Sequence, residues 1–173
     1  DSQTYLIDIN NIASYTGKKH SRDDRLYYWT GMSLAGKALK ELSKVYIAYA
    51  KAQMNITRKC LVVDLDNTIW GGTIGEDGLS GIKLGPDFPG NIYYDFQKYL
   101  LQLYKKGIIL AINSKNNKAD VDDVFNNHPY MILKKEHFAC IKTNWQDKIT
   151  NMYEIANEIN VGIESMVFVD DNP

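Results

Sequence analysis

Carboxylates stand in two close-spaced pairs in this sequence. Asp64 and Asp66 are two residues apart and are followed by the hydroxyl of Thr68, while Asp170 and Asp171 are adjacent. Carboxylates beside a buried segment carry a high desolvation cost unless a cation or bound protons compensate them. Because Mg²⁺ prefers hard oxygen ligands, the two pairs predict a magnesium site if the fold brings them together.

A second group of polar residues suits phosphate oxygens. Four polar residues follow one another and offer two amides, a hydroxyl and an ammonium: Asn113, Ser114, Lys115 and Asn116. Lys148 stands where we expect a helix to begin, and it can bring a further positive charge to the same place. Lys142 is the alternative cation, but we expect Lys142 to belong to a strand.

Short apolar runs precede most of these polar groups and define the elements that must position them. We expect strands over 60–63, 108–112, 138–141 and 166–169, and helices over about 91–106, 118–127 and 146–160. Each run is too short for a helix and too continuously apolar for a sheet with one wet face. The alternation predicts an α/β fold: a Rossmann-like parallel sheet with helices on both faces, whose ligands bind at the carboxyl ends of the strands.

The first 57 residues follow a different pattern. Residues 10–24 are polar and indicate a loop, and Ser33 is a plausible N-cap for an amphipathic helix of about five turns that ends before Asn55. We therefore expect an N-terminal segment over 1–57 and a catalytic domain over 58–173. The sequence ends two residues after Asp170-Asp171, and a sheet that ended there would expose an unpaired edge. We therefore expect this chain to be part of a longer polypeptide.

Composition and charge exclude several classes of protein. The chain is 45% hydrophobic and 24% charged, which is typical of a globular protein. Its 173 residues are too few for two full-sized domains. Residues 1–60 carry ten Lys and Arg against five Asp and Glu, whereas residues 61–173 carry ten against sixteen. The acidic second part argues against nucleic acid as the partner, and no apolar run approaches the roughly 18 residues that a membrane span needs.

Two cysteines, Cys60 and Cys140, share no close-spaced motif. With no disulfide framework to form, we expect a cytoplasmic location. Cys60 precedes Asp64 by four residues, or roughly 13 Å along an extended strand, which argues against a thioester on Cys60 beside that carboxylate. Trp70 and Trp145 we interpret as packing residues.

The motifs together resemble the haloacid dehalogenase (HAD) superfamily. Asp-x-Asp-x-Thr follows the first strand, Ser114 the second, Lys148 opens a helix 22 residues before Asp170, and Asp-Asp follows a later strand. The segments Asp-Leu-Asp-Asn-Thr-Ile-Trp-Gly-Gly over 64–72, Asn-Trp-x-x-Lys over 144–148 and Phe-Val-Asp-Asp-Asn-Pro over 168–173 resemble the FkbH-like branch. The resemblance covers 58–173 well and 1–57 only loosely.

This resemblance implies a role for each candidate residue. Asp64 would be the nucleophile that forms an aspartyl-phosphate, and Asp66 the general acid and base. The implied Mg²⁺ ligands are Asp64, the backbone carbonyl of Asp66, Asp170 and Asp171. The implied substrate-binding residues are Thr68, Ser114, Lys115, Asn116 and Lys148. Between Asp64 and Ser114 we expect a glycine-rich flap over 70–89 and no large cap domain.

The FkbH-like branch joins a phosphatase to a glyceryl transferase. A phosphorylated acyl donor, a glyceric acid phosphoanhydride, loses its phosphate and its acyl group is loaded onto an acyl carrier protein. Two alternatives stay open: a plain uncapped HAD phosphatase acting on a phosphoprotein or a small phosphate ester, and a non-catalytic scaffold domain. A further interpretation of residues 1–57 is the tail of an SGNH-like hydrolase domain, although the Asp-x-x-His pair of those enzymes is absent, since the residue three positions after Asp24 is Tyr27.

Overall fold

The computed structural model describes residues 6–54 and 56–171 of the chain. The chain divides into two compact units, Asp1–Thr57 and Arg58–Pro173. Each unit is described by itself below.

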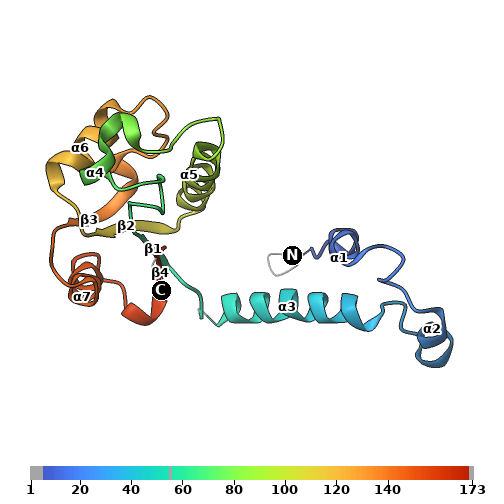
Figure 1. The fold of residues 1–173 in the computed structure, drawn as a ribbon. Helices are drawn as coiled ribbons and strands as arrows, with labels where there is room; N and C mark the ends of the chain where they lie inside the picture. The colour runs from blue at the N-terminus through green and yellow to red at the C-terminus, as the bar shows by residue number, and fades with distance from the viewer. Residues whose placement is uncertain (1–5, 55, 172–173) are drawn as a thin grey trace. The chain divides into compact units, whose positions relative to one another are not determined.

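The second unit is built on a four-stranded parallel sheet (Figure 1). Its strands are β1 (Cys60–Val63), β2 (Ile109–Ser114), β3 (Phe138–Thr143) and β4 (Met166–Val169), in the order β3-β2-β1-β4. β1 pairs with both β2 and β4, so the carboxyl ends of these three strands are neighbours. This arrangement confirms the predicted α/β fold with a parallel sheet.

Helices cover both faces of the sheet because successive strand residues point to opposite sides. Leu61 and Val63 pack in the core on the side of α4 (Ile74–Gly81), α5 (Gly90–Lys105) and α6 (Lys118–Asn127). Cys60 and Val62 pack in a second core with residues of α7 (Lys148–Glu158). Figure 1 shows α7 on the opposite side of the sheet from the other three helices. Two short 3₁₀ helices, η1 (Lys135–His137) and η2 (Ile163–Ser165), lead into β3 and β4.

The predicted boundaries need two corrections in this unit. β2 and β3 extend two residues beyond the expected 112 and 141, because Asn113 and Ser114 pair with Lys142 and Thr143 in the parallel ladder. The predicted flap over 70–89 contains a helix, α4, which is kinked where Gly78 adopts a φ of 66°. Within the described chain, α4 is the one helix between β1 and α5.

The first unit contains three helices, α1 (Ile9–Thr16), α2 (Asp24–Thr30) and α3 (Gly36–Gln53). The predicted loop over 10–24 is wrong for residues 10–16 and for residue 24, which are helical, and correct for residues 17–23. The Asp8 side chain caps α1 by accepting a hydrogen bond from the backbone of Asn11. Asp23 caps α2 in the same way. Both helices are short and largely exposed, so they leave little apolar periodicity in the sequence.

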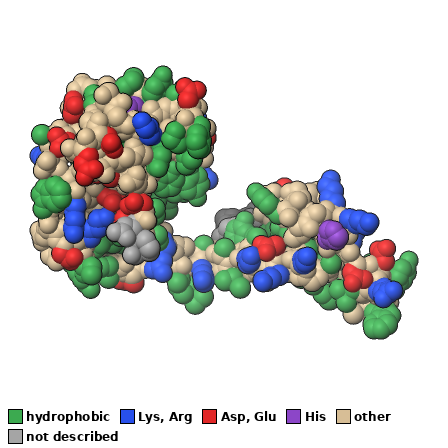
Figure 2. Space-filling model, in the orientation of Figure 1, with side chains coloured by type: hydrophobic (Ala, Val, Ile, Leu, Met, Phe, Trp, Pro, Cys, Tyr) green, Lys and Arg blue, Asp and Glu red, His purple; other side chains and the backbone are tan. Residues whose placement is uncertain are grey.

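The long helix of this unit begins later than predicted. Its N-cap is Ala35 rather than Ser33, since the Ala35 N–H donates to the carbonyl of Ser21 and the preceding residue pairs with Arg22. The helix ends at Gln53, which agrees with the predicted end before Asn55. Lysines along α3 appear as blue side chains in Figure 2.

Among the described residues, no helix combines the length and apolar character needed to cross a membrane.

A buried glutamine on α5 joins three backbone segments of the second unit. The Gln97 Nε2 atom donates to the carbonyl of Ile69 at 2.8 Å, and its Oε1 accepts from the N–H groups of Ile132 and Leu133. Gln97 is fully buried. Because buried backbone groups need partners, this side chain holds the segment after Asp66 in place.

We expect Gln97→Leu to lower the free energy of unfolding by about 2–4 kcal/mol, because it leaves buried backbone groups unpaired at about 1–3 kcal/mol each. Gln102→Leu, an exposed position on the same helix, is the matched control and should change stability little. Urea unfolding of both variants measures the difference. Equal stability of the two variants would contradict the role assigned to Gln97.

Candidate functional site

Asp64 stands at the junction of β1 and β4. Its backbone N–H donates to the carbonyl of Val169 at 2.9 Å, which continues the β1–β4 pairing by one residue. Asp170 follows Val169 directly, so the two carboxylates come together at the carboxyl edge of the sheet. The Asp64 side chain is buried, and its Oδ1 accepts a hydrogen bond from the N–H of Leu65 at 2.8 Å.

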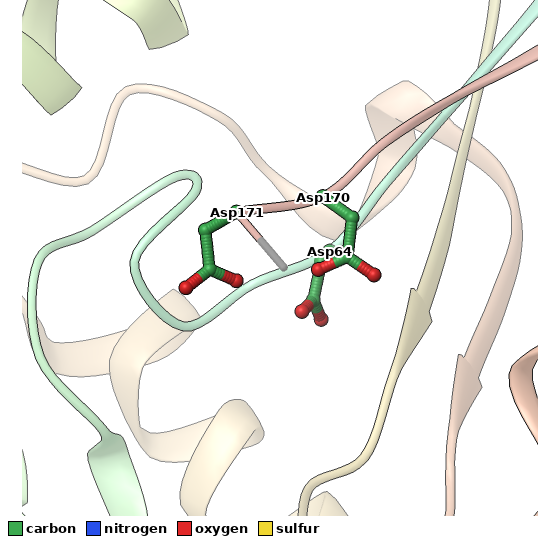
Figure 3. Close-up of side chains that lie close together, drawn as sticks. All are labelled: Asp64, Asp170 and Asp171. Atoms are coloured by element: carbon green, nitrogen blue, oxygen red, sulfur yellow. The ribbon is translucent and has the colours of Figure 1, made fainter. Parts of the chain in front are cut away.

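Three carboxylates form an acidic cluster at this edge (Figure 3). Oxygen atoms of Asp64, Asp170 and Asp171 all lie within 4.8 Å of one another. Burial, followed by a hydrogen bond to Asp170 and repulsion from it, raises the pKa of the Asp171 carboxyl. Three hard oxygen donors at this spacing, whose charges repel, fit a divalent cation such as Mg²⁺.

Lys148 contributes the positive charge in contact with this cluster. Its Nζ lies 2.8 Å from Asp64 Oδ2 and 2.7 Å from Asp170 Oδ2. Burial by itself lowers the pKa of the ammonium, but hydrogen bonds to Asp170 and Asp64 and the charges of these carboxylates raise the pKa overall. Lys148 therefore stays protonated. Lys142 pairs with Glu154 and Glu158 instead, at 3.2 and 3.1 Å.

A buried network of asparagines fixes the start of α7 and hence the backbone of Lys148. Asn113 donates from Nδ2 to the carbonyl of Lys148 at 2.9 Å, and its Oδ1 accepts from Asn151 at 3.0 Å. Asn151 also exchanges hydrogen bonds with Asn144. Asn113 and Asn151 are fully buried. Asn113, predicted to suit phosphate oxygens, instead uses its amide to hold the start of α7. The sequence analysis did not predict a role for Asn151.

Asp66 belongs to a separate hydrogen-bond system. Its Oδ1 accepts from Trp70 Nε1 at 2.8 Å and from the backbone of Ile74 at 3.1 Å, and its Oδ2 accepts from Asn116 Nδ2 at 3.1 Å. The Asn116 amide also donates to Ser114 Oγ at 3.1 Å. The expected convergence of four carboxylates is therefore corrected to three, with the Asp66 side chain held by N–H donors instead.

The remaining candidates differ in their surroundings. The Thr68 side chain is buried, and its Oγ1 has no hydrogen-bond partner within the described part of the chain. Ser114 is buried beside Asn116. Lys115 is exposed and forms no ion pair with any described residue.

The two tryptophans have different roles. Trp70 is fully buried and packs edge-to-face on Phe125, with ring centroids 6.5 Å apart. The interpretation of Trp145 as a packing residue is wrong, because 71% of its surface is exposed. Trp145 lies in the loop between β3 and α7 and donates from Nε1 to Asn117 Oδ1 at 3.1 Å. This bond joins the two loops that carry Asn116 and Lys148.

Both cysteines are buried thiols with no disulfide. Burial raises the pKa of Cys60 to about 11. Burial, with a smaller contribution from a hydrogen bond to Glu158, raises the pKa of Cys140 to about 11 as well. Neither side chain forms a thiolate near neutral pH, so neither offers a ready nucleophile.

Comparison with solved structures finds a similar chain, the N-terminal part of the protein BF1531 from Bacteroides fragilis, which contains a phosphatase domain and was solved complexed with Mg. The two chains superpose with a TM-score of 0.87 and share 36% sequence identity. The match covers 98% of this chain and 45% of that chain, so this chain spans a little under half of its length. No family model matches the chain, and no curated protein matches it. The chain is thus similar in sequence and fold to a segment that contains a phosphatase domain.

Proposed function

We propose that this protein is a Mg²⁺-dependent phosphatase of the HAD type that forms an aspartyl-phosphate on Asp64. The observation that carries the proposal is the contact of the Lys148 ammonium with both Asp64 and Asp170 at the carboxyl edge of a parallel sheet. A cation beside a nucleophilic carboxylate is what an incoming dianionic phosphate requires. The similarity to the phosphatase domain of BF1531 supports the same activity.

The acidic cluster supports the metal part of this proposal. Asp64, Asp170 and Asp171, together with the backbone carbonyl of Asp66, are the residues that would hold Mg²⁺. Mg²⁺, when bound, supplies positive charge that lets the phosphate approach a carboxylate. The similar BF1531 structure was solved with Mg.

The chain's own residues would divide the reaction into two displacements. In the first, an Asp64 oxygen attacks phosphorus, the bond to the leaving oxygen breaks, and Asp66 donates a proton to that oxygen. In the second, Asp66 takes a proton from water as the water attacks phosphorus, and Asp64 leaves as a free carboxylate. Lys148 and Ser114 would hold the equatorial oxygens, with Lys115, Asn116 and the hydroxyl of Thr68 beside them.

A second, narrower candidate is transfer of a glyceryl group from its phosphoanhydride to an acyl carrier protein. The open edge of the sheet and two sequence segments favour it over a plain phosphatase. The insertion between β1 and α5 holds only α4 in the described chain, which leaves the edge open to a bulky partner. Both thiols are buried with raised pKa values, so an acceptor thiol would come from another molecule. The Trp-Gly-Gly and Asn-Trp-x-x-Lys segments resemble the FkbH-like branch.

We expect Asp64→Asn to abolish Mg²⁺-dependent phosphate release from aryl phosphates, because an amide oxygen is a poor nucleophile and the metal loses a charged ligand. Asp95→Asn, at an exposed position on α5, is the control and should keep full activity. Phosphate release with and without Mg²⁺ is the measurement. Near-normal turnover by Asp64→Asn would overturn the assignment, and no activity in the unaltered protein would favour a scaffold domain.

The two lysines provide a matched pair, because their side chains are similarly exposed, at 24% for Lys148 and 22% for Lys142. We expect Lys148→Ala to lower kcat/KM for aryl phosphates at least a hundredfold, on the order of the loss of one charge-stabilising donor. Lys142→Ala should change it less than threefold, since it removes only pairs with exposed glutamates. The reverse ranking would exclude Lys148 from the phosphate site.

Glyceryl transfer is tested with a carrier protein bearing phosphopantetheine, Mg²⁺ and a glyceryl phosphoanhydride. We expect the carrier to gain one glyceryl mass and phosphate release to rise when the carrier is added. Cys60→Ala should keep this loading, because the buried thiol has a pKa of about 11. Intact-mass spectrometry measures the product. Hydrolysis of small esters without carrier loading would support the plain phosphatase, and loading lost in Cys60→Ala would indicate an enzyme-bound thioester.

A further inference from the structure

The shortest hydrogen bond to the Asp66 side chain comes from Trp70, which the sequence analysis interpreted as a packing residue. We propose that Trp70 is a positioning residue for Asp66: its indole N–H, together with the N–H of Ile74, holds Oδ1 so that the proton Asp66 transfers resides on Oδ2. This inference rests on the phosphatase activity proposed above. Trp70 would then support proton transfer although it is not one of the paired carboxylates.

The hydrogen bonds assign different tasks to the two oxygens of Asp66. A carboxylate oxygen has two lone pairs that accept hydrogen bonds in its plane. Oδ1 uses both, one for Trp70 Nε1 at 2.8 Å and one for the Ile74 N–H at 3.1 Å. A proton on Oδ1 would displace one of these donors. The transferable proton therefore belongs on Oδ2.

Oδ2 keeps a lone pair that the hydrogen bonds among the described residues do not use. It accepts one hydrogen bond, from Asn116 Nδ2 at 3.1 Å. The same amide nitrogen lies 3.1 Å from Ser114 Oγ, so Oδ2 is joined through Asn116 to a hydroxyl that we assign to the phosphate oxygens. A proton on Oδ2 is thus two hydrogen bonds away from the hydroxyl that we assign to the phosphate oxygens.

Core packing fixes the position of the indole. Trp70 is fully buried and packs against Phe125. The backbone on either side is also held: Gln97 donates to the carbonyl of Ile69, and Gly71 exchanges two hydrogen bonds with Lys83, at 3.0 and 2.7 Å. The N–H group cannot follow Asp66 if that side chain rotates. The rigid core therefore sets the rotamer of Asp66 rather than the reverse.

The simpler explanation is that Asp66 only satisfies a buried indole N–H. Both explanations predict a loss of stability when the N–H is removed. Only a positioning role predicts that the loss of rate depends on the leaving group, because a good leaving group departs without a proton and a poor one needs a general acid. The leaving group thus separates the two explanations.

The test compares Trp70→Phe with the unaltered full chain on p-nitrophenyl phosphate and on phenyl phosphate, with Mg²⁺. The quantity is kcat/KM, which reports the steps up to departure of the leaving group. We expect Trp70→Phe to lower kcat/KM at least tenfold more on phenyl phosphate, whose leaving group needs a proton, than on p-nitrophenyl phosphate. Asp66→Asn should exceed this selective loss.

Two further variants keep the test decisive. Phe125→Leu disturbs the packing of Trp70 but not its N–H, so it should lower both rates by the same factor. Ile74→Pro removes the other donor to Oδ1 at the first position of α4, where proline is compatible with a helix, and it should repeat the selective loss even if Trp70→Phe fails to fold. An equal loss on both substrates in Trp70→Phe and Ile74→Pro overturns this inference alone. No turnover of either substrate by the unaltered protein overturns the proposed function instead.

Discussion

The carboxyl edge of the sheet depends on compensation of negative charge. Asp64, Asp170 and Asp171 converge there because β1 and β4 are paired neighbours, and their repulsion must be balanced by a cation. Lys148 provides part of that balance through contacts with Asp64 and Asp170 at 2.8 and 2.7 Å. The same charge that stabilises the folded edge is the charge that an incoming phosphate would use.

The rest of the second unit positions this one ammonium group. α7 packs on one face of the sheet, and its first turn is tied to β2 by Asn113 and Asn151. Buried amides of this kind are costly when unpaired, so the network fixes both the depth and the rotation of the helix start. The opposite face holds the second system, in which Trp70 and α4 constrain Asp66. The two proposed roles, charge stabilisation and proton transfer, are thus supported from opposite sides of the sheet.

Separation of the two systems has a chemical consequence. Asp64 contacts an ammonium, whereas within the described part of the chain the Asp66 side chain accepts hydrogen bonds from neutral N–H groups. Two carboxylates two residues apart in sequence therefore experience different surroundings. This difference accompanies the different roles that we propose for the two carboxylates.

Much of the fold could be predicted from the sequence because buried parallel strands are short apolar runs. The limits of β1 and β4 and the extent of α6 agree with the pattern of residues 58–173. The polar residues at the strand ends could also be assigned to one edge, since parallel strands share their direction. The helices α1 and α2 could not be predicted from the sequence, because caps at Asp8 and Asp23 stabilise them without apolar periodicity.

The sequence by itself determined which residues reach the carboxyl edge of the sheet: Asp64, Ser114 and Asp170 follow from strand length and direction alone. Only the tertiary structure decided their partners. The contacts of Lys148 with Asp64 and Asp170, the exposure of Trp145 and the bond from Trp70 to Asp66 depend on how separate elements pack. Hydrogen-bond partners are set by distances and angles of a few tenths of an ångström, which residue type and spacing do not encode.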